Sequence, residues 1–126
     1  MTDLDTVLSI HERLIAKYGG SKGIRDKGLL LAALARPFAT FDQKDLYPSP
    51  SEKAAAIFES VIINHPFLDG NKRIAFVLLR LTLYQSGFDI AASVDEKYEM
   101  TIAASTGDMR MDEIKLWIED KLIKTD

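Results

Sequence analysis

The segment 72–86 is apolar on nearly every face of a helix, and this feature limits the possible folds more than any other. Its longest unbroken apolar run, Ile74–Leu79, is far too short to cross a bilayer, which takes about 20 residues. A helix that is hydrophobic all round and spans no membrane is buried inside a protein. We therefore expect a central helix at about residues 72–86, ended by Gly87, with other helices packed around it.

The remaining apolar residues also recur with a helical period, and no stretch shows the sustained alternation of a half-buried strand. Ser49 with Glu52, and Ser93 with Glu96, have the spacing of a capping box, so each pair predicts a helix start. Further helices are expected over 4–18, from Asp26 to Ala35, from Ser49 to Asn64, from Ser93 to Thr106 and over 114–122. The sequence thus predicts one all-α domain, residues 1–126, of about six helices.

Composition narrows the possible functions. The chain has 126 residues and no cysteine, which excludes disulfides, thiolate zinc sites and cysteine nucleophiles. Its formal net charge of -3 argues against the uniform basic face of a protein that grips nucleic acid. The segment 1–5 lacks the pattern of a secretory signal. We therefore expect a cytoplasmic protein without a membrane segment and without direct nucleic-acid contact.

Residues 37–50 form the longest segment that we expect to be irregular. Aromatic and charged side chains occur here without any period, and Ser49 with Pro50 then starts the next helix. Two interpretations are open: a functional lid, or a packed loop that connects two helices.

The loop before the central helix gathers a titratable base, a carboxylate, a glycine, an amide and two cations. It reads His65-Pro66-Phe67-Leu68-Asp69-Gly70-Asn71-Lys72-Arg73. The N-terminus of a helix exposes unpaired N–H groups at the positive end of its dipole, so it attracts anions. Gly70 lets the backbone approach an anion closely, while Lys72 and Arg73 add full charges. These cations oppose the helix dipole unless an anion lies between them and the helix, so the pattern predicts an anion site.

Two further side chains of the loop predict a reaction. Asp69 is a hard oxygen ligand beside a phosphate nest, which suits a Mg²⁺ ion that bridges carboxylate and phosphate. The imidazole of His65 is a base that can take a proton from a substrate hydroxyl. Together they predict a reaction between a hydroxyl and a metal-bound nucleoside triphosphate. Phe67 is expected to be an apolar anchor that holds the loop to the core.

Each of these residues also has a simpler interpretation. A histidine before a proline usually caps or packs, Asp-Gly-Asn is a common turn, and Lys-Arg is usually a solvated pair. Their combination at one helix start favours the anion site.

The nine residues of this loop resemble the signature of the Fic/Doc superfamily, which reads His, any residue, Phe, any residue, Asp or Glu, Gly or Ala, Asn, Gly or Lys, Arg. All seven defined positions match in order, between two expected helices. The segments 18–26 and 45–55 are similar to the death-on-curing (Doc) branch. The resemblance implies a Fic-type helical bundle with a short flap before the motif, at residues 38–47, which docks a target peptide.

Two differences from the adenylyltransferase branch bear on the reaction. That branch has a second glycine after the asparagine and a second arginine three residues beyond the first, where this chain has Lys72 and Phe76. Loss of the second arginine removes a clamp on the triphosphate, which argues against AMP transfer. The Doc branch has the lysine and resembles a protein kinase that binds ATP in the reverse sense. The resemblance thus implies transfer of the ATP γ-phosphate to a serine or threonine hydroxyl of a translation factor, elongation factor Tu, which arrests translation.

The resemblance also implies a role for each residue of the loop. His65 would be the catalytic base, Asp69 the Mg²⁺ ligand, Gly70, Asn71 and Lys72 the anion hole, and Lys72 and Arg73 the cations that grip the phosphates of ATP. Arg80, seven residues beyond Arg73, is expected to form a structural ion pair.

Restraint of such an enzyme is expected from outside the chain. Many relatives that transfer AMP carry an inhibitory helix with Ser or Thr, three residues, Glu, then Gly or Asn, and this string is missing here. The resemblance implies a type II toxin held by a small Phd-like antitoxin, whose disordered tail folds on binding. Two alternatives remain open: a Fic-type AMP transferase, and a non-catalytic binding module or co-repressor that acts with its antitoxin.

Overall fold

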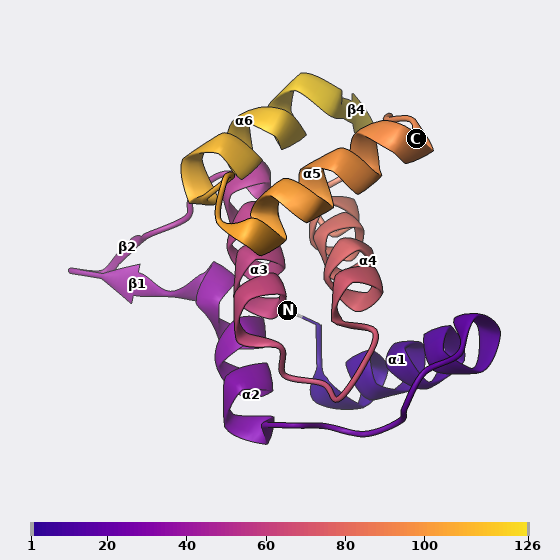
Figure 1. The fold of residues 1–126 in the computed structure, drawn as a ribbon. Helices are drawn as coiled ribbons and strands as arrows, with labels where there is room; N and C mark the ends of the chain where they lie inside the picture. Colours follow the sequence, from indigo (N-terminus) through magenta and orange to yellow (C-terminus); the bar gives the residue numbers. More distant parts are fainter. Residues whose placement is uncertain (1, 126) are drawn as a thin grey trace.

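Two helices lie side by side at the centre of the molecule and carry much of its core. They are α3 (Pro50–Asn64) and α4 (Asn71–Tyr84), and one short loop joins them (Figure 1). The computed structural model describes residues 2–125. Within these residues the other helices are α1 (Leu4–Tyr18), α2 (Lys27–Ala35) with the 3-10 turn η1 (Arg36–Phe38), α5 (Val94–Thr106) and α6 (Met111–Lys121). The prediction of an all-α fold with about six helices is confirmed.

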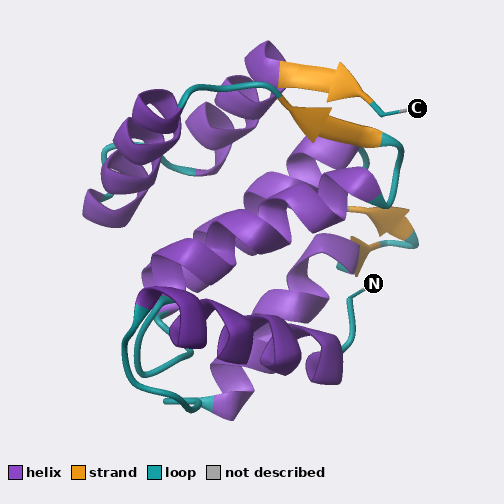
Figure 2. Cartoon of the chain, turned by 90° about the vertical axis from the view of Figure 1, so that its right-hand side faces the viewer, coloured by secondary structure: helices purple, strands orange, loops and turns teal. Residues whose placement is uncertain are grey.

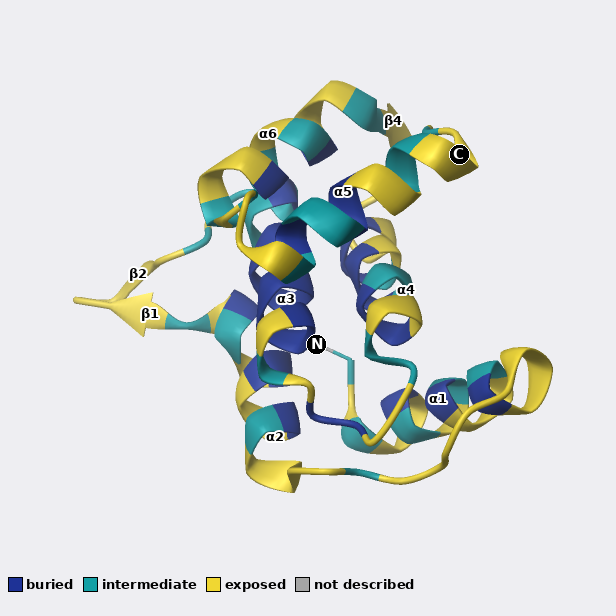
Figure 3. Cartoon of the chain, in the orientation of Figure 1, coloured by how far each residue is buried: buried dark blue, intermediate teal, exposed yellow. Residues whose placement is uncertain are grey.

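The predicted central helix at 72–86 corresponds to α4, which buries Ile74, Leu78 and Leu79 completely. Its neighbour α3 is buried along nearly its whole length, as the dark blue ribbon in Figure 3 shows. The three alanines at 54–56 are fully buried and let other helices approach α3 closely. Alanine is only weakly hydrophobic, so the sequence pattern predicted α4 as the central helix, although more residues of α3 are buried.

Two short antiparallel strand pairs were not predicted. Strand β3 (Phe88–Ile90) pairs with β4 (Leu122–Lys124), as Figure 2 shows near the C-terminus. Arg80 of α4 donates two hydrogen bonds to the Asp89 carboxylate of β3, at 3.0 and 2.9 Å, so the expected structural ion pair is confirmed. Strands of two or three residues are too short to show a period, and the helices α5 and α6 separate β3 from β4 in the chain.

The second pair lies in the segment that the sequence left open as a lid or a packed loop. Strands β1 (Thr40–Phe41) and β2 (Lys44–Asp45) form a hairpin that projects from the helices (Figure 1). Asp42 and Gln43 form its turn with positive φ values of 52° and 64°, as the turn of a two-residue hairpin requires. The ring of Phe41 is 75% exposed, so the tip does not pack on the core.

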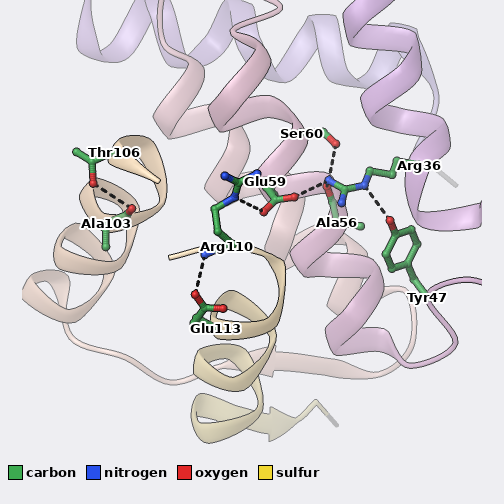
Figure 4. Close-up of polar contacts among 9 residues, drawn as sticks. All are labelled: Arg36, Tyr47, Ala56, Glu59, Ser60, Ala103, Thr106, Arg110 and Glu113. Carbon is green, nitrogen blue, oxygen red and sulfur yellow. Dashed lines mark hydrogen bonds and ion pairs between the residues drawn. The ribbon is translucent and has the colours of Figure 1, made fainter. Parts of the chain in front are cut away.

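A polar network fixes the base of this hairpin to the bundle (Figure 4). Arg36 donates hydrogen bonds to the Glu59 carboxylate and the Ser60 hydroxyl, both at 3.0 Å, and to the Tyr47 hydroxyl at 3.1 Å. Burial acts to lower the pKa of Arg36, but its bonds to Tyr47 and Glu59 outweigh burial and raise the pKa above its usual value. Arg110, just before α6, lies 3.6 Å from the second oxygen of Glu59. Glu59 therefore joins the hairpin, α3 and α6.

Within residues 2–125, none of the helices combines the length and the apolar character that a membrane span requires.

Candidate active site

A pocket of about 340 Å³ opens at the N-terminus of α4. Its lining comes from the loop between α3 and α4 and from the first turn of α4: His65, Leu68, Asp69, Gly70, Asn71, Lys72 and Arg73. The structure thus brings six of the predicted site residues to one pocket. The seventh, Phe67, is 1% exposed and lies in the core.

His65 ends α3 with an unusual backbone conformation. Its φ and ψ are 48° and 61°, in the left-handed region. Pro66 disfavours right-handed helical geometry in the residue before it, so the helix cannot continue through His65. The carbonyl of His65 accepts a hydrogen bond from the Arg25 guanidinium at 2.6 Å, and the exposed imidazole lines the pocket.

The start of α4 presents backbone amides to the pocket. Gly70 is the N-cap residue with φ 74° and ψ 17°, and no side chain within residues 2–125 caps this end. The first amides of a helix have no acceptor inside the helix. The amides of Asn71, Lys72 and Arg73 are therefore available to an anion, whereas the Gly70 amide already donates to the Asp69 carboxylate at 2.8 Å.

The side chain of Asn71 serves the loop rather than the pocket. Its Oδ1 accepts a hydrogen bond from the Phe67 amide, and its Nδ2 donates to the Phe67 carbonyl, both at 3.0 Å. These two bonds close the loop on itself directly above the buried Phe67 ring. For the predicted anion hole, Asn71 therefore offers its backbone amide, and its side chain keeps the loop in shape.

The Asp69 carboxylate is oriented by two backbone amides, those of Gly70 and Ser21, at 2.8 and 3.2 Å. A Cβ atom on Gly20 would lie 2.7 Å from an Asp69 oxygen, so only glycine allows this close approach. Residues 2–125 contain no cluster of three or more acidic, histidine or cysteine side chains that could hold a metal by themselves. In nucleotide sites Mg²⁺ is usually held by one or two carboxylates, by phosphate oxygens and by water. The Asp69 carboxylate, beside amides that can hold the phosphate, fits this arrangement.

A second loop supports the motif loop, a role that sequence reasoning did not assign to it. The amides of Arg25 and Asp26 donate to the Pro66 carbonyl at 2.8 and 3.0 Å, and the Leu68 amide donates to Gly23 at 3.1 Å. Residues 19–26 therefore run beside the motif loop as a backbone brace. The sequence signal was its three glycines, Gly19, Gly20 and Gly23, which all have positive φ values.

The two cations of the motif lie at the mouth of the pocket, and both are exposed. The Arg73 guanidinium carbon lies 4.4 Å from the centre of the Tyr18 ring at the end of α1. A guanidinium stacked on an aromatic ring loses less freedom when it binds phosphate, because the ring already restricts its rotamers. Tyr18 is a further residue that the site uses and that sequence reasoning did not assign.

Phe76 occupies the position where the adenylyltransferase pattern has its second arginine. Its ring packs edge-on against Phe58 and Trp117, with centroid distances of 5.8 and 6.3 Å. This position therefore serves the packing of α4 and offers no charge to a phosphate.

The fold and the pocket define a class of protein: a small helical domain that holds an anion-binding loop at the start of a buried helix. The family model described as Fic/DOC family matches residues 1–83, which is more than half of the chain. The chain belongs to this family, and the family resemblance expected from the motif is confirmed.

Several known proteins are similar to the chain. "Toxin Doc" of Mycolicibacterium smegmatis is 40% identical over 99 residues, 77% of this chain and 76% of that protein. "Protein kinase doc" of Escherichia phage P1 is 26% identical over 110 residues, 87% of this chain and 86% of that protein. "Protein adenylyltransferase fic-1" of Caenorhabditis elegans is 37% identical over 73 residues, 55% of this chain but 14% of that protein. The similarity to the two Doc proteins thus extends over most of both chains, which places this chain in the Doc branch.

Proposed function

We propose that the protein is a Doc-type toxin and a protein kinase that transfers the γ-phosphate of ATP to a serine or threonine hydroxyl. The observation that carries the proposal is the pocket at the start of α4, where a base, a carboxylate, free amides and two cations converge. The similarity to a phage protein kinase over 87% of the chain supports the choice of reaction. Elongation factor Tu is the proposed substrate, and its modification would arrest translation.

The reaction assigns one task to each group. The imidazole of His65 accepts the proton of the substrate hydroxyl as its oxygen attacks the γ-phosphorus of ATP. The bond from this phosphorus to the β–γ bridging oxygen breaks, and ADP leaves with that oxygen. Backbone amides at the start of α4 and the side chains of Lys72 and Arg73 hold the charge that develops on the phosphoryl oxygens. Asp69 would hold Mg²⁺, which neutralises phosphate charge when it is bound.

Two observations favour phosphate over AMP transfer. Phe76 packs against Phe58 and Trp117 where an adenylyltransferase would place a second arginine on the triphosphate. Lys72 adds an exposed cation beside the pocket where that branch has glycine. AMP transfer is the second candidate, because the C. elegans adenylyltransferase is 37% identical over 73 residues.

Differently labelled ATP separates the two reactions. The purified protein is incubated with elongation factor Tu and Mg²⁺, once with ATP labelled on the γ-phosphate and once with ATP labelled on the α-phosphate. Phosphate transfer predicts label on the protein substrate from the γ position alone. Label from the α position alone would overturn the kinase assignment and support AMP transfer.

A third interpretation is a non-catalytic binding module or co-repressor that uses the anion site to hold its partner. Expression of His65→Ala in cells tests it, because this change removes the proposed base without altering the amides of α4. We expect His65→Ala to relieve growth arrest, while Lys115→Ala, a change at a partly exposed lysine of α6, should leave it intact. Equal growth arrest by His65→Ala and by the parent would show that catalysis is not the cause of toxicity.

The proposed partner that restrains the toxin is a small Phd-like antitoxin with a disordered tail. Its existence is tested by co-purification from cells that express the natural operon. Full toxicity of the protein when the whole operon is expressed would contradict this part of the proposal.

A further inference from the structure

A histidine of α1 lies buried beneath the motif loop, and the proposed reaction gives it no task. His11 is 1% exposed, although imidazole is a polar group. Its ring stacks on the Phe67 ring with a centroid distance of 3.8 Å and an angle of 10° between the planes. Its Nε2 atom lies 2.8 Å from the backbone carbonyl oxygen of Asp69, a residue 58 positions away in the chain.

This contact fixes which atom donates. A carbonyl oxygen can only accept, so Nε2 of His11 carries a proton and donates it to Asp69. The contact is partly buried, so a carbonyl that loses its donor there has poor access to water, and the folded state is destabilised by more than the lost bond alone. The bond between His11 and Asp69 therefore ties α1 to the motif loop.

The orientation of this one carbonyl sets the direction of an amide in the pocket. The carbonyl of Asp69 and the amide of Gly70 belong to the same peptide group, which is planar and trans. The C=O and N–H bonds of a trans peptide point in opposite directions. Because His11 holds the oxygen toward the core, the Gly70 amide must point away from the core, where it holds the Asp69 carboxylate at 2.8 Å.

Glycine at position 70 makes this arrangement possible. A Cβ atom on Gly70 would lie 3.2 Å from Cδ1 of Ile15 and 3.5 Å from Nε2 of His11. The positive φ of 74° also suits glycine. Helix α1 thus packs directly under the turn that starts α4.

We propose that His11 is a positioning residue for the site: by holding the Asp69–Gly70 peptide, it keeps the Gly70 amide and the Asp69 carboxylate in the geometry that binds a Mg²⁺-bound phosphate. Its effect on catalysis rests on the proposed kinase function. Its effect on the shape of the loop does not, because it follows from contacts within the chain.

Two substitutions separate the hydrogen bond from the packing. His11→Phe keeps an aromatic ring to stack on Phe67 and removes the donor. His11→Gln loses the ring but places a side-chain N–H donor at the same number of bonds from Cβ as Nε2 of histidine. Ile118→Val, a core change in α6 outside the pocket, is the control for a general loss of stability.

The first measurement uses the full chain without nucleotide. Order parameters from ¹⁵N relaxation are expected to fall at Gly70 and Asn71 in His11→Phe, from about 0.85 toward 0.6 or below. We expect His11→Gln to recover part of the loss and Ile118→Val to leave both amides rigid. Unchanged order parameters in His11→Phe, or an equal fall in Ile118→Val, would overturn the proposal.

The second measurement is the dissociation constant for ATP with Mg²⁺. We expect roughly ten-fold weaker binding in His11→Phe, the size of effect that one buried hydrogen bond can have, and a smaller loss in His11→Gln. If His11→Phe does not fold, then His11→Gln decides: binding within two-fold of Ile118→Val supports the proposal, and a loss as large as that of Asp69→Asn contradicts it. A parent that binds ATP but transfers no phosphate would refute the proposed kinase function, whereas the order parameters would still decide the role of His11.

Discussion

Substitution Asn71→Ala provides a quantitative test of how the motif loop is held. The Asn71 side chain makes two hydrogen bonds of 3.0 Å to the amide and carbonyl of Phe67. Phe67 is 1% exposed, so alanine would leave two backbone groups with poor access to water. Each lost bond costs about 1 kcal/mol, and each orphaned group raises the cost toward about 1–3 kcal/mol. We expect the free energy of unfolding to fall by about 2–4 kcal/mol.

Reversible unfolding in urea, monitored by circular dichroism, measures this change. For a domain of this size the loss corresponds to a fall in Tm of roughly 10 °C. Gln85→Ala is the matched control, because this exposed amide side chain makes one hydrogen bond to Thr2 at 3.1 Å, and its loss should cost less than about 0.5 kcal/mol. If the free energy of unfolding falls by less than about 1 kcal/mol in Asn71→Ala, or by the same amount in the control, the claim that the Asn71 side chain holds the motif loop is refuted.

Three further predictions concern the surroundings of the pocket and the folded state. Gly20→Ala would place a Cβ atom 2.7 Å from the Asp69 carboxylate at a φ of 113°, so we expect calorimetry to find weaker Mg²⁺-dependent ATP binding. Unchanged binding would contradict the claim that the loop at residues 19–26 positions Asp69. Glu59→Gln removes the charge that faces Arg36 at 3.0 Å; it should lower the free energy of unfolding by about 1–3 kcal/mol in urea titrations, and a change below about 0.5 kcal/mol would show that the network contributes little. The Glu96 carboxylate has a pKa lowered to about 2 by the Ser93 amide and by Lys121. The ionised Glu96 therefore stabilises the folded chain above its unfolded pKa, and this contribution is lost as the pH falls toward 2. Glu96→Gln should flatten the acid side of the curve of unfolding free energy against pH, and an unchanged curve would show that Glu96 does not cause this dependence.

The helices could be predicted from the sequence because their signals are local. The predicted bounds of α1 and α3 agree with the structure, because the residues that delimit these helices act within a few positions: Gly19 ends α1, Ser49 caps the start of α3 and Pro66 follows its end. The strand pair β3 with β4 could not be predicted in this way. It joins residues more than thirty positions apart, such as Phe88 and Lys124, and only the packing of α5 and α6 brings them together.

The same distinction between local and distant signals in the sequence applies to the candidate site. All residues of the pocket belong to one continuous motif, so sequence reasoning could gather them. The residues that orient the motif, His11, Tyr18 and Ser21, contact it from positions more than forty residues earlier in the chain. Single-sequence periodicity places His11 on the buried face of α1 but does not reveal that its Nε2 atom meets the carbonyl of Asp69. The two roles of Asn71, whose side chain holds the loop and whose amide faces the pocket, also depend on the three-dimensional arrangement of the loop.

The mass of elongation factor Tu after incubation with the protein, ATP and Mg²⁺ tests the central claim most directly. The kinase assignment predicts that intact-mass spectrometry finds a gain equal to one phosphate, located on a serine or threonine by fragmentation. The same gain should be absent with His65→Ala, whereas Lys115→Ala should produce it. A gain equal to one AMP, or an equal phosphate gain with His65→Ala, would contradict the account.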